Sequence, residues 1–288
     1  MLLSLLNMEE KELISDLIKL AFAEDIGDGD HTTLSSIPGT VSGSSKLLIK
    51  EEGILAGVDV AREVFRMFDP DLHTEVFIHD GADVKPGDVA FMVSGKVRSI
   101  LQTERLVLNI MQRMSGIATI TRKYVKLLEG TSAKVLDTRK TTPGMRILEK
   151  QAVKIGGGVN HRTGLYDMIL LKDNHVDFAG GIENALLGAQ KYLKEKNKTL
   201  KIEIEVRSLS ELEEALRVGG VDRIMLDNFT PEKSREAVKI VNGRVALESS
   251  GGITFDSIRQ YAETGVDYIS VGALTHSVKS LDMSLKAV

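Results

Sequence analysis

Polar and charged side chains follow a series of short apolar segments in the second half of the chain. The segments read AKVLDTRK, MILLKDNH, KIEIEV, RIMLDN, VALESSGG and YISVGA, and each predicts a β-strand. The residues at their ends are Asp137, Thr138, Arg139, Lys140, Lys172, Asp173, Asn174, Glu205, Arg207, Asp227, Asn228, Glu248, Ser249, Ser250 and Gly272. Any single one could mark a strand boundary only. The recurrence of polar residues at the ends of several predicted strands indicates a binding site, because parallel α/β barrels have their sites at the carboxyl ends of the strands.

Four cations gather at this predicted rim. They are Arg139, Lys140, Arg162 and Lys172, with His161 beside Arg162 in the segment GGGVNHR. Forked guanidinium groups suit carboxylates and phosphates, so the cluster predicts an anionic ligand. The glycines of this segment either connect two elements flexibly or let backbone amides approach an anion. A network of salt bridges with the neighbouring acids is the structural alternative.

The acids Glu205 and Asp227 predict a different partner at the same rim. Carboxylates beside an anionic ligand suit hydroxyl groups or a divalent cation, and Mg²⁺ bound to a phosphate substrate prefers such oxygen ligands. Two glycine-bearing loops, SSGGI at 249–253 and VGALT at 271–275, precede predicted helices. Loops of this kind in the last two strands of a barrel predict a site for a phosphate monoester.

The elements that must position these residues are repeated βα units. Continuous runs of Ile, Val and Leu are typical of strands covered on both faces, and the helical patterns between them predict a parallel, incomplete α/β barrel. Six strands are evident, and a full barrel needs two more, for which 157–159 and the residues before Lys134 are candidates. An open doubly wound sheet uses the same alternation, but no GxGxxG motif follows its first strand.

The first 113 or so residues predict a separate α+β layer. We expect helices at 9–24 and 58–68, strands at 45–51, 74–78 and 89–94, and a long helix at 99–129 leading into the barrel. Asp25, Asp28 and Asp30 lack the spacing of a calcium loop and predict a turn or a helix cap. Met111 and Met114 on the long helix are interpreted as core residues.

Composition excludes several function classes. The 288 residues include 37 Lys and Arg against 41 Asp and Glu, a net charge of -4, which argues against a nucleic-acid partner and against docking on anionic membranes. The absence of cysteine excludes a Cys nucleophile, a Cys-ligated zinc and an iron-sulfur cluster. No apolar run approaches the roughly 20 residues of a membrane helix, and no signal-peptide pattern is evident, so we expect a cytoplasmic protein.

Longer segments resemble the quinolinate phosphoribosyltransferase family. They are EDIGDGDHTT, ERLVLNIMQRMSGIAT, LDTRKTTPGMRILEKQAVKIGGGVNHRTGLYDMILLKDNH, IMLDNF, LESSGGI and GVDYISVGALTHS. The resemblance implies an N-terminal α/β sandwich at 1–113, an open, incomplete TIM-like α/β barrel at 114–274, and a C-terminal helix at 275–288 that returns to the first domain. It also implies a homodimer, or a hexamer, in which Arg105 reaches the active site of the partner.

The resemblance further implies an activity and residue roles. The reaction transfers the phosphoribosyl group of phosphoribosyl pyrophosphate to quinolinate with decarboxylation, giving nicotinate mononucleotide, pyrophosphate and CO₂ in de novo NAD biosynthesis, with Mg²⁺ and no organic cofactor. Lys140, Lys172, Glu205 and Asp227 are the expected catalytic residues, and Glu205 and Asp227 the expected Mg²⁺ ligands, directly or through substrate or water. The expected substrate-binding residues are Arg105, Thr138, Arg139, Lys140, His161, Arg162, Lys172, Glu205, Asp227, Ser250, Gly251, Gly252, Val271, Gly272 and Ala273.

Two other functions stay open on the residues alone. A related transferase acting on a monocarboxylate such as nicotinate would need fewer cations than the four at the rim. A noncatalytic barrel that binds a phosphosugar would not need strand-end acids such as Glu205 and Asp227.

Overall fold

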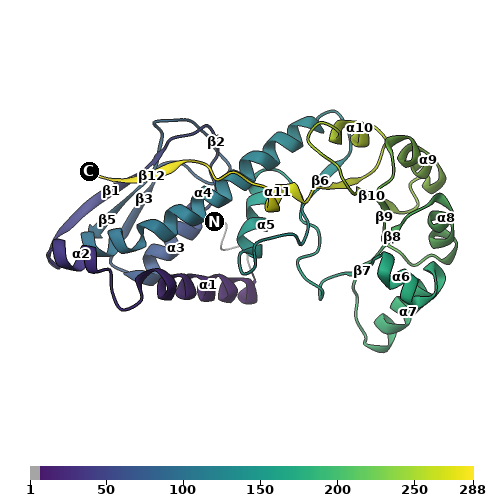
Figure 1. Cartoon of the computed structure of the whole chain (residues 1–288), viewed down its shortest axis with the longest axis horizontal. Helices are drawn as coiled ribbons and strands as arrows, with labels where there is room; N and C mark the ends of the chain where they lie inside the picture. The colour runs from purple at the N-terminus through teal and green to yellow at the C-terminus, as the bar shows by residue number, and fades with distance from the viewer. Residues whose placement is uncertain (1–6) are drawn as a thin grey trace. The chain divides into compact units, whose positions relative to one another are not determined.

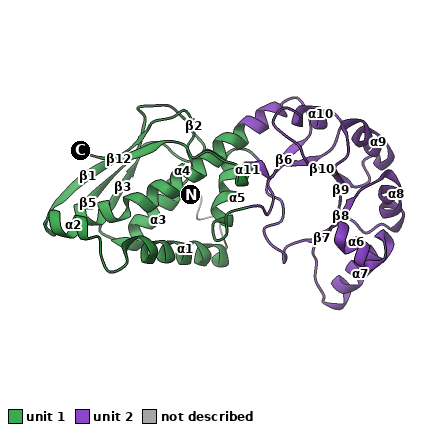
Figure 2. Cartoon of the chain, viewed as in Figure 1, with its two compact units in different colours: residues 1–122, 141–157, 274–288 green, residues 123–140, 158–273 purple. Residues whose placement is uncertain are grey.

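The computed structural model describes residues 7–288, and the chain divides into two compact units (Figure 2). Unit 1 contains the described residues up to Arg122 together with Thr141–Gly157 and Leu274–Val288, and unit 2 contains Lys123–Lys140 and Gly158–Ala273. The units are therefore not the contiguous domains 1–113 and 114–274 that the sequence predicts. Residues 141–157 form part of unit 1, although they lie between two barrel strands in the sequence.

Unit 1 is built on an antiparallel sheet of strand order β12-β1-β5-β3. Its strands are β1 (Ser42–Ile49), β3 (His73–Val76), β5 (Val89–Lys96) and β12 (Met283–Ala287), and β2 (Gly53–Ile54) pairs separately with β4 (Asp83–Val84). Its helices are α1 (Met8–Ile26), α2 (His31–Ser36), α3 (Val58–Phe68), most of α4 (Val97–Leu127) and α5 (Arg146–Ile155) (Figure 1). Phe65 of α3 packs edge-on against Phe91 of β5 with ring centroids 5.9 Å apart, which confirms the predicted α/β layer.

The C-terminal segment returns to unit 1 as a strand, so the predicted helix at 275–288 is wrong. A four-residue helix, α11 (Ala273–His276), is followed by β12, which pairs antiparallel with β1 from Ser45↔Ala287 to Ile49↔Met283. Met283 and Leu285 are buried while Ser284 between them is less so, the alternation of a strand with one covered face. The segment also covers an edge of the sheet, whose unpaired backbone groups would otherwise be exposed.

Unit 2 is a parallel sheet of six strands in the order β6-β11-β10-β9-β8-β7, and it confirms the predicted open barrel. The strands are β6 (Lys134–Leu136), β7 (Ile169–Leu171), β8 (Ile202–Val206), β9 (Arg223–Asp227), β10 (Ala246–Ser250) and β11 (Tyr268–Ser270). The helices are α6 (Asp173–Ala179), α7 (Ile182–Glu195), α8 (Leu209–Val218), α9 (Pro231–Val241) and α10 (Ile258–Ala262), and Figure 1 shows α7–α10 outside the curved sheet.

The barrel is open between β6 and β7. The seventh strand predicted at 157–159 is reduced to one parallel bridge between Leu136 and Val159. The eighth strand predicted before Lys134 is absent from the described residues, because 128–133 form turns and irregular backbone. The carboxyl ends of all six strands still meet at one edge of the sheet, which is where the polar strand-end residues lie.

Several smaller sequence predictions are confirmed. The side chain of Asp30 accepts the backbone N–H of Thr33 at 3.0 Å and caps α2, as a helix cap does. Met111 and Met114 are fully buried in the core. No helix within residues 7–288 combines the length and the apolarity needed to cross a membrane.

Asp80 offers a test of the packing in unit 1. Its Oδ1 accepts the backbone N–H of Val58 at the start of α3 at 2.9 Å, while its buried Oδ2 has no hydrogen-bond partner. Burial, aided by Asp59, raises the pKa of Asp80 from 3.8 to about 6. The folded protein thus holds the Asp80 proton more tightly than the unfolded chain does, so stability falls as the pH rises from 3.8 through about 6.

We expect Asp80→Asn to remove this pH dependence, because the amide keeps the acceptor for Val58 and carries no charge. The variant should be more stable than the unchanged protein by roughly 1–2 kcal/mol at pH 8 and about equal to it at pH 4. Urea unfolding of both proteins at the two pH values measures the difference. An equal difference at both values would contradict the assignment.

Candidate active site

The polar residues of unit 2 form two layers, because residues two apart on a strand point to the same face. In the register of the sheet Glu203 lies beside Arg223, and four residues further along β9, Asp227 lies beside Ser250 of β10. Glu205, two residues beyond Glu203 on β8, lies beside Met225 in the register, and its charge interacts with that of Asp227 toward the carboxyl ends. The layer at the strand ends can meet a ligand, and the layer beneath it is enclosed in protein.

Two of the predicted cations are close to each other. Burial first, and the nearby positive charge of Arg139 second, lower the pKa of Arg162. Arg162 Nη1 donates to the carbonyl of Met168 at 3.2 Å. Arg139 and Lys140 follow β6 in the predicted loop, where Thr138 Oγ1 accepts the N–H of Lys140 at 3.0 Å. Two guanidinium groups that repel each other beside a strand end favour an anion between them.

The acids Glu205 and Asp227 are also brought together. Burial raises the pKa of Glu205 to about 7, with the neighbouring charge of Asp227 as the second cause, while Lys172 opposes the shift. Lys172 is the residue that precedes α6, and its backbone N–H donates to His175 Nδ1 at 2.9 Å. The two carboxylates repel each other, and a cation between them would relieve that repulsion, so the pair fits Mg²⁺ as the predicted donor set.

The two glycine loops follow neighbouring strands. β10 ends at Ser250 and is followed by Gly251 and Gly252, with φ of 96° and 60°. β11, which pairs with β10, is followed by Val271 and Gly272, and Ala273 begins α11. The Ser250 carbonyl accepts the N–H of Asn228, so the first loop lies directly against the residue after Asp227.

Gly251 cannot be replaced without movement. A Cβ there would overlap Asn228 Oδ1 and lie 2.6 Å from Asn228 Cγ and 3.0 Å from its backbone N. Asn228 Nδ2 in turn donates to Asp227 Oδ2 at 2.9 Å. The glycine therefore lets the loop approach the strand-end acid, which the spacing of the sequence motif alone did not indicate.

His161 lies in the enclosed layer and not at the exposed rim. Its side chain is 6% exposed, and its Nε2 lies 3.0 Å from Glu203 Oε2 and 3.5 Å from Glu248 Oε2. Arg223 Nη1 donates to Glu248 Oε2 at 2.9 Å, and its guanidinium lies 4.3 Å from the centre of the Tyr268 ring. Burial raises the pKa of both Glu203 and Glu248.

Sequence reasoning missed Glu203 and Arg223 as members of this layer. The signal was present in the strand IEIEV, where Glu203 and Glu205 alternate with isoleucine and must share a face. His161, Glu203 and Glu248 offer ligand atoms within 4.8 Å of one another, the donor types of a metal site. Because Arg223 already brings a positive charge to Glu248, we assign no metal to this buried layer.

Arg105 is the predicted residue that the structure places elsewhere. It lies on α4 in unit 1 with an exposed side chain, whereas the other predicted site residues lie in unit 2. The structure therefore brings together Thr138 to Lys140, His161, Arg162, Lys172, Glu205, Asp227 and the two glycine loops within one unit, and does not add Arg105 to them.

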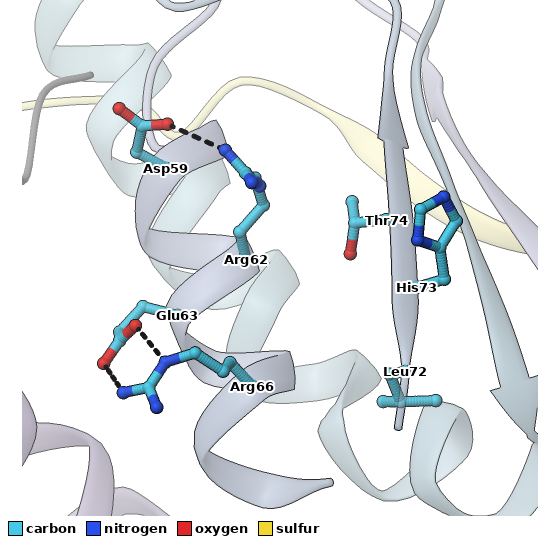
Figure 3. Close-up of a pocket in the computed structure, with 7 residues that line it drawn as sticks. All are labelled: Asp59, Arg62, Glu63, Arg66, Leu72, His73 and Thr74. Atoms are coloured by element: carbon cyan, nitrogen blue, oxygen red, sulfur yellow. Dashed lines mark hydrogen bonds and ion pairs between the residues drawn. The ribbon is translucent and has the colours of Figure 1, made fainter. Parts of the chain in front are cut away.

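A surface hollow in unit 1 contains none of the predicted residues. Figure 3 shows it between α3 and β3, lined by Asp59, Arg62, Glu63, Arg66, Leu72, His73 and Thr74. Arg66 is paired with Glu63 at 2.6 Å, and Arg62 lies 3.8 Å from Asp59. Its charges are thus balanced locally and leave no excess for an anionic ligand.

Known proteins resemble the chain over nearly its whole length. The model of the quinolinate phosphoribosyl transferase C-terminal domain matches residues 117–286, and that of the N-terminal domain matches residues 30–115. Quinolinate phosphoribosyltransferase [decarboxylating] 1b of Nicotiana tabacum is 44% identical, covering 95% of this chain and 82% of the relative. A probable nicotinate-nucleotide pyrophosphorylase [carboxylating] of Bacillus subtilis (strain 168) is 43% identical, covering 94% and 92%.

Solved structures agree with the sequence matches. The nicotinate-nucleotide pyrophosphorylase of Francisella tularensis superposes with a TM-score of 0.89 at 42% identity, covering 96% of each chain. The two domain models together span most of the chain, in the order in which they are named. This chain belongs to the quinolinate phosphoribosyltransferase family.

Proposed function

We propose that this chain transfers the phosphoribosyl group of phosphoribosyl pyrophosphate to quinolinate and releases pyrophosphate and CO₂, leaving nicotinate mononucleotide for NAD synthesis. Relatives with more than 40% identity carry the names of this activity. The observation that carries the proposal is the gathering of Arg139, Lys140, Arg162 and Lys172 in unit 2, with Arg139 and Lys140 following β6 and Lys172 following β7. Two adjacent guanidinium groups suit the two adjacent carboxylates of quinolinate better than the single carboxylate of nicotinate.

In this proposal the cations hold quinolinate. Arg139 and Arg162 bind the two carboxylates, and Lys140 and Lys172 line the same pocket. Thr138 supports this loop through its bond to the Lys140 N–H. The positive charge keeps both carboxylates ionised and orients the pyridine nitrogen toward the ribose.

The opposite strands hold phosphoribosyl pyrophosphate. Ser250, Gly251 and Gly252 with Val271, Gly272 and Ala273 bind the 5-phosphate through backbone amides of the two loops. Glu205 and Asp227 accept hydrogen bonds from the ribose hydroxyls. The same two carboxylates would hold Mg²⁺, directly or through water, and the metal would neutralise charge on the pyrophosphate. Lys140 and Lys172 add positive charge on the pyrophosphate side. No organic cofactor is proposed.

In this proposal the reaction depends on the charged side chains that surround the two substrates. The nitrogen lone pair of quinolinate forms a bond to C1 of the ribose as the bond from C1 to pyrophosphate breaks, through a transition state with positive charge on the ribose. Glu205 and Asp227 stabilise that charge. The ring nitrogen is then cationic, so C2 can hold the electron pair left when its carboxylate departs as CO₂, and C2 takes up a proton from water.

The assay of purified protein with quinolinate, phosphoribosyl pyrophosphate and Mg²⁺ tests the proposal. Nicotinate mononucleotide, pyrophosphate and CO₂ should appear in equal amounts, and omission of Mg²⁺ should abolish turnover. A nucleotide product formed without CO₂, or no product from quinolinate, would overturn the proposal. The cytoplasmic location stays a prediction.

The proposed assembly is a homodimer, or a hexamer built from three such dimers, in which Arg105 completes the site of a partner. Arg105→Ala and Arg139→Ala should each be nearly inactive when pure, because each removes one carboxylate contact from every site. After subunit exchange, mixed dimers contain one site free of both changes, so an equal mixture should regain about a quarter of the normal activity. Mass spectrometry should confirm that the subunits have exchanged. A mixture that is still inactive after that exchange would contradict an active site shared between two subunits.

A further inference from the structure

The imidazole of His161 is held from within unit 2. Its Nδ1 accepts the backbone N–H of Arg162 at 2.7 Å, and its Nε2 lies 3.0 Å from Glu203 Oε2. Because Nδ1 accepts a hydrogen, the ring proton lies on Nε2, where it faces the carboxylates of Glu203 and Glu248. Both ring nitrogens thus face groups of the protein.

The groups around His161 come from several strands. Asp137, which follows β6 and is fully buried, accepts the His161 N–H with Oδ1 at 2.8 Å. Glu203 of β8 and Glu248 of β10 face Nε2, and Arg223 of β9 lies 2.9 Å from Glu248 and 3.7 Å from Glu203. Asp137 thus fixes the main chain of His161, and the carboxylates of Glu203 and Glu248 lie within ion-pair distance of its ring.

Arg162 is held at two points as a result. Its main-chain N–H is bound to the His161 ring, and its Nη1 donates to the Met168 carbonyl at 3.2 Å. Losing the first point would free the backbone from which the guanidinium extends. A misplacement of about 1 Å at a binding group can cost on the order of 100-fold in rate.

We propose that His161 is a positioning residue that sets the place of Arg162, and that Asp137, Glu203, Glu248 and Arg223 hold it there. This inference rests on the proposed function, in which Arg162 binds a quinolinate carboxylate. It replaces the expectation that His161 itself binds the substrate. The buried layer beneath the strand ends then serves the site by fixing one of its arginines.

Two amide substitutions of His161 test the roles of its two ring nitrogens separately. In His161→Asn the side-chain oxygen can take the place of Nδ1 and accept the Arg162 N–H. In His161→Gln the amide reaches toward Glu203 as Nε2 does but leaves no acceptor at the Nδ1 position. We expect His161→Gln to raise the KM for quinolinate at least about tenfold with the KM for phosphoribosyl pyrophosphate within threefold, and His161→Asn to keep both within about threefold. Equal losses in the two variants would overturn the proposal.

A double-mutant cycle with Arg162→Ala tests whether His161 acts through Arg162. If it does, the variant that carries both His161→Gln and Arg162→Ala should have the same kcat/KM for quinolinate as Arg162→Ala alone, within about twofold. If His161 contacts the substrate, the two losses should multiply, and that result would overturn the proposal. Unfolding midpoints of all variants identify any that fail to fold, and if His161→Gln does not fold, His161→Ala, which also lacks an acceptor at the Nδ1 position, takes its place in the cycle.

A second readout needs no substrate and separates this inference from the proposed function. The amide hydrogen of Arg162 should exchange slowly in the unchanged protein and in His161→Asn, and at least about tenfold faster in His161→Gln. Equal exchange in the three proteins would overturn the positioning role even if quinolinate is turned over. Failure of the quinolinate assay with this exchange pattern intact would count against the proposed function alone.

Discussion

Replacing Glu205 with glutamine is expected to lower kcat by about 100-fold to 1,000-fold, with a smaller change in the KM for quinolinate. The amide has nearly the shape of the carboxylate and can still accept one hydrogen bond from a ribose hydroxyl. It cannot stabilise positive charge on the ribose, nor share a cation with Asp227. Burial and the nearness of Asp227 raise the pKa of Glu205 to about 7. A cation shared with Asp227, or the positive charge that develops on the ribose, favours the ionised form of Glu205 that the amide cannot supply.

Asp267→Asn provides the matched control for Glu205→Gln. Asp267 Oδ2 accepts the backbone N–H of Leu247 at 2.8 Å near the start of β10, at the end of the sheet away from the site. The same loss of one carboxylate charge there should leave kcat within about twofold, since the group lies at the far end of the strands. Steady-state kinetics of both variants decide the matter. Comparable losses of kcat in both variants, or no loss in Glu205→Gln, would show that Glu205 takes no part in the chemical step.

Gly251→Ala is expected to lower kcat/KM for phosphoribosyl pyrophosphate by roughly 10-fold to 100-fold. The added Cβ would lie 3.0 Å from the backbone N of Asn228 and would press on its side chain, which is bonded to Asp227. Relief requires movement of the phosphate loop, of Asn228, or of both. The φ of 96° adds strain of its own, because side chains rarely adopt that region.

Gly243→Ala isolates the effect of the backbone angle. Gly243 has a φ of 71° and nothing within 4 Å of the position a Cβ would take. Its replacement should cost about 1 kcal/mol in stability and leave the kinetics unchanged. If Gly251→Ala showed full activity, the close approach of the loop to Asn228 would have no part in substrate binding.

The barrel could be predicted because its strands are buried on both faces. Continuous apolar runs such as those of β7 and β9 are distinctive, and the polar residue that follows each run lies at the site edge by the rules of parallel sheets. The strand order and the opening between β6 and β7 did not follow from the runs. They depend on contacts between distant segments, of which the single bridge at Val159 is an example.

The C-terminal strand and the buried layer escaped prediction for different reasons. Leu281, Met283 and Leu285 alternate with polar residues, which is the period of a strand, but the predicted helix came from the family resemblance and not from this pattern. Glu203 and Arg223 read as solvated charges in the sequence, since charged residues are rarely buried without partners. Their partners, His161 and Glu248, lie far away in the chain and are brought to them by the pairing of the strands in the curved sheet.

The specificity ratio between quinolinate and nicotinate tests the central claim most directly. If paired arginines at the strand ends recognise two carboxylates, kcat/KM for quinolinate should exceed that for nicotinate by at least about 1,000-fold. The ratio should be measured with the same protein, phosphoribosyl pyrophosphate and Mg²⁺, following pyrophosphate release for both substrates. A ratio near one, or a preference for nicotinate, would contradict the assignment of this site to a dicarboxylate.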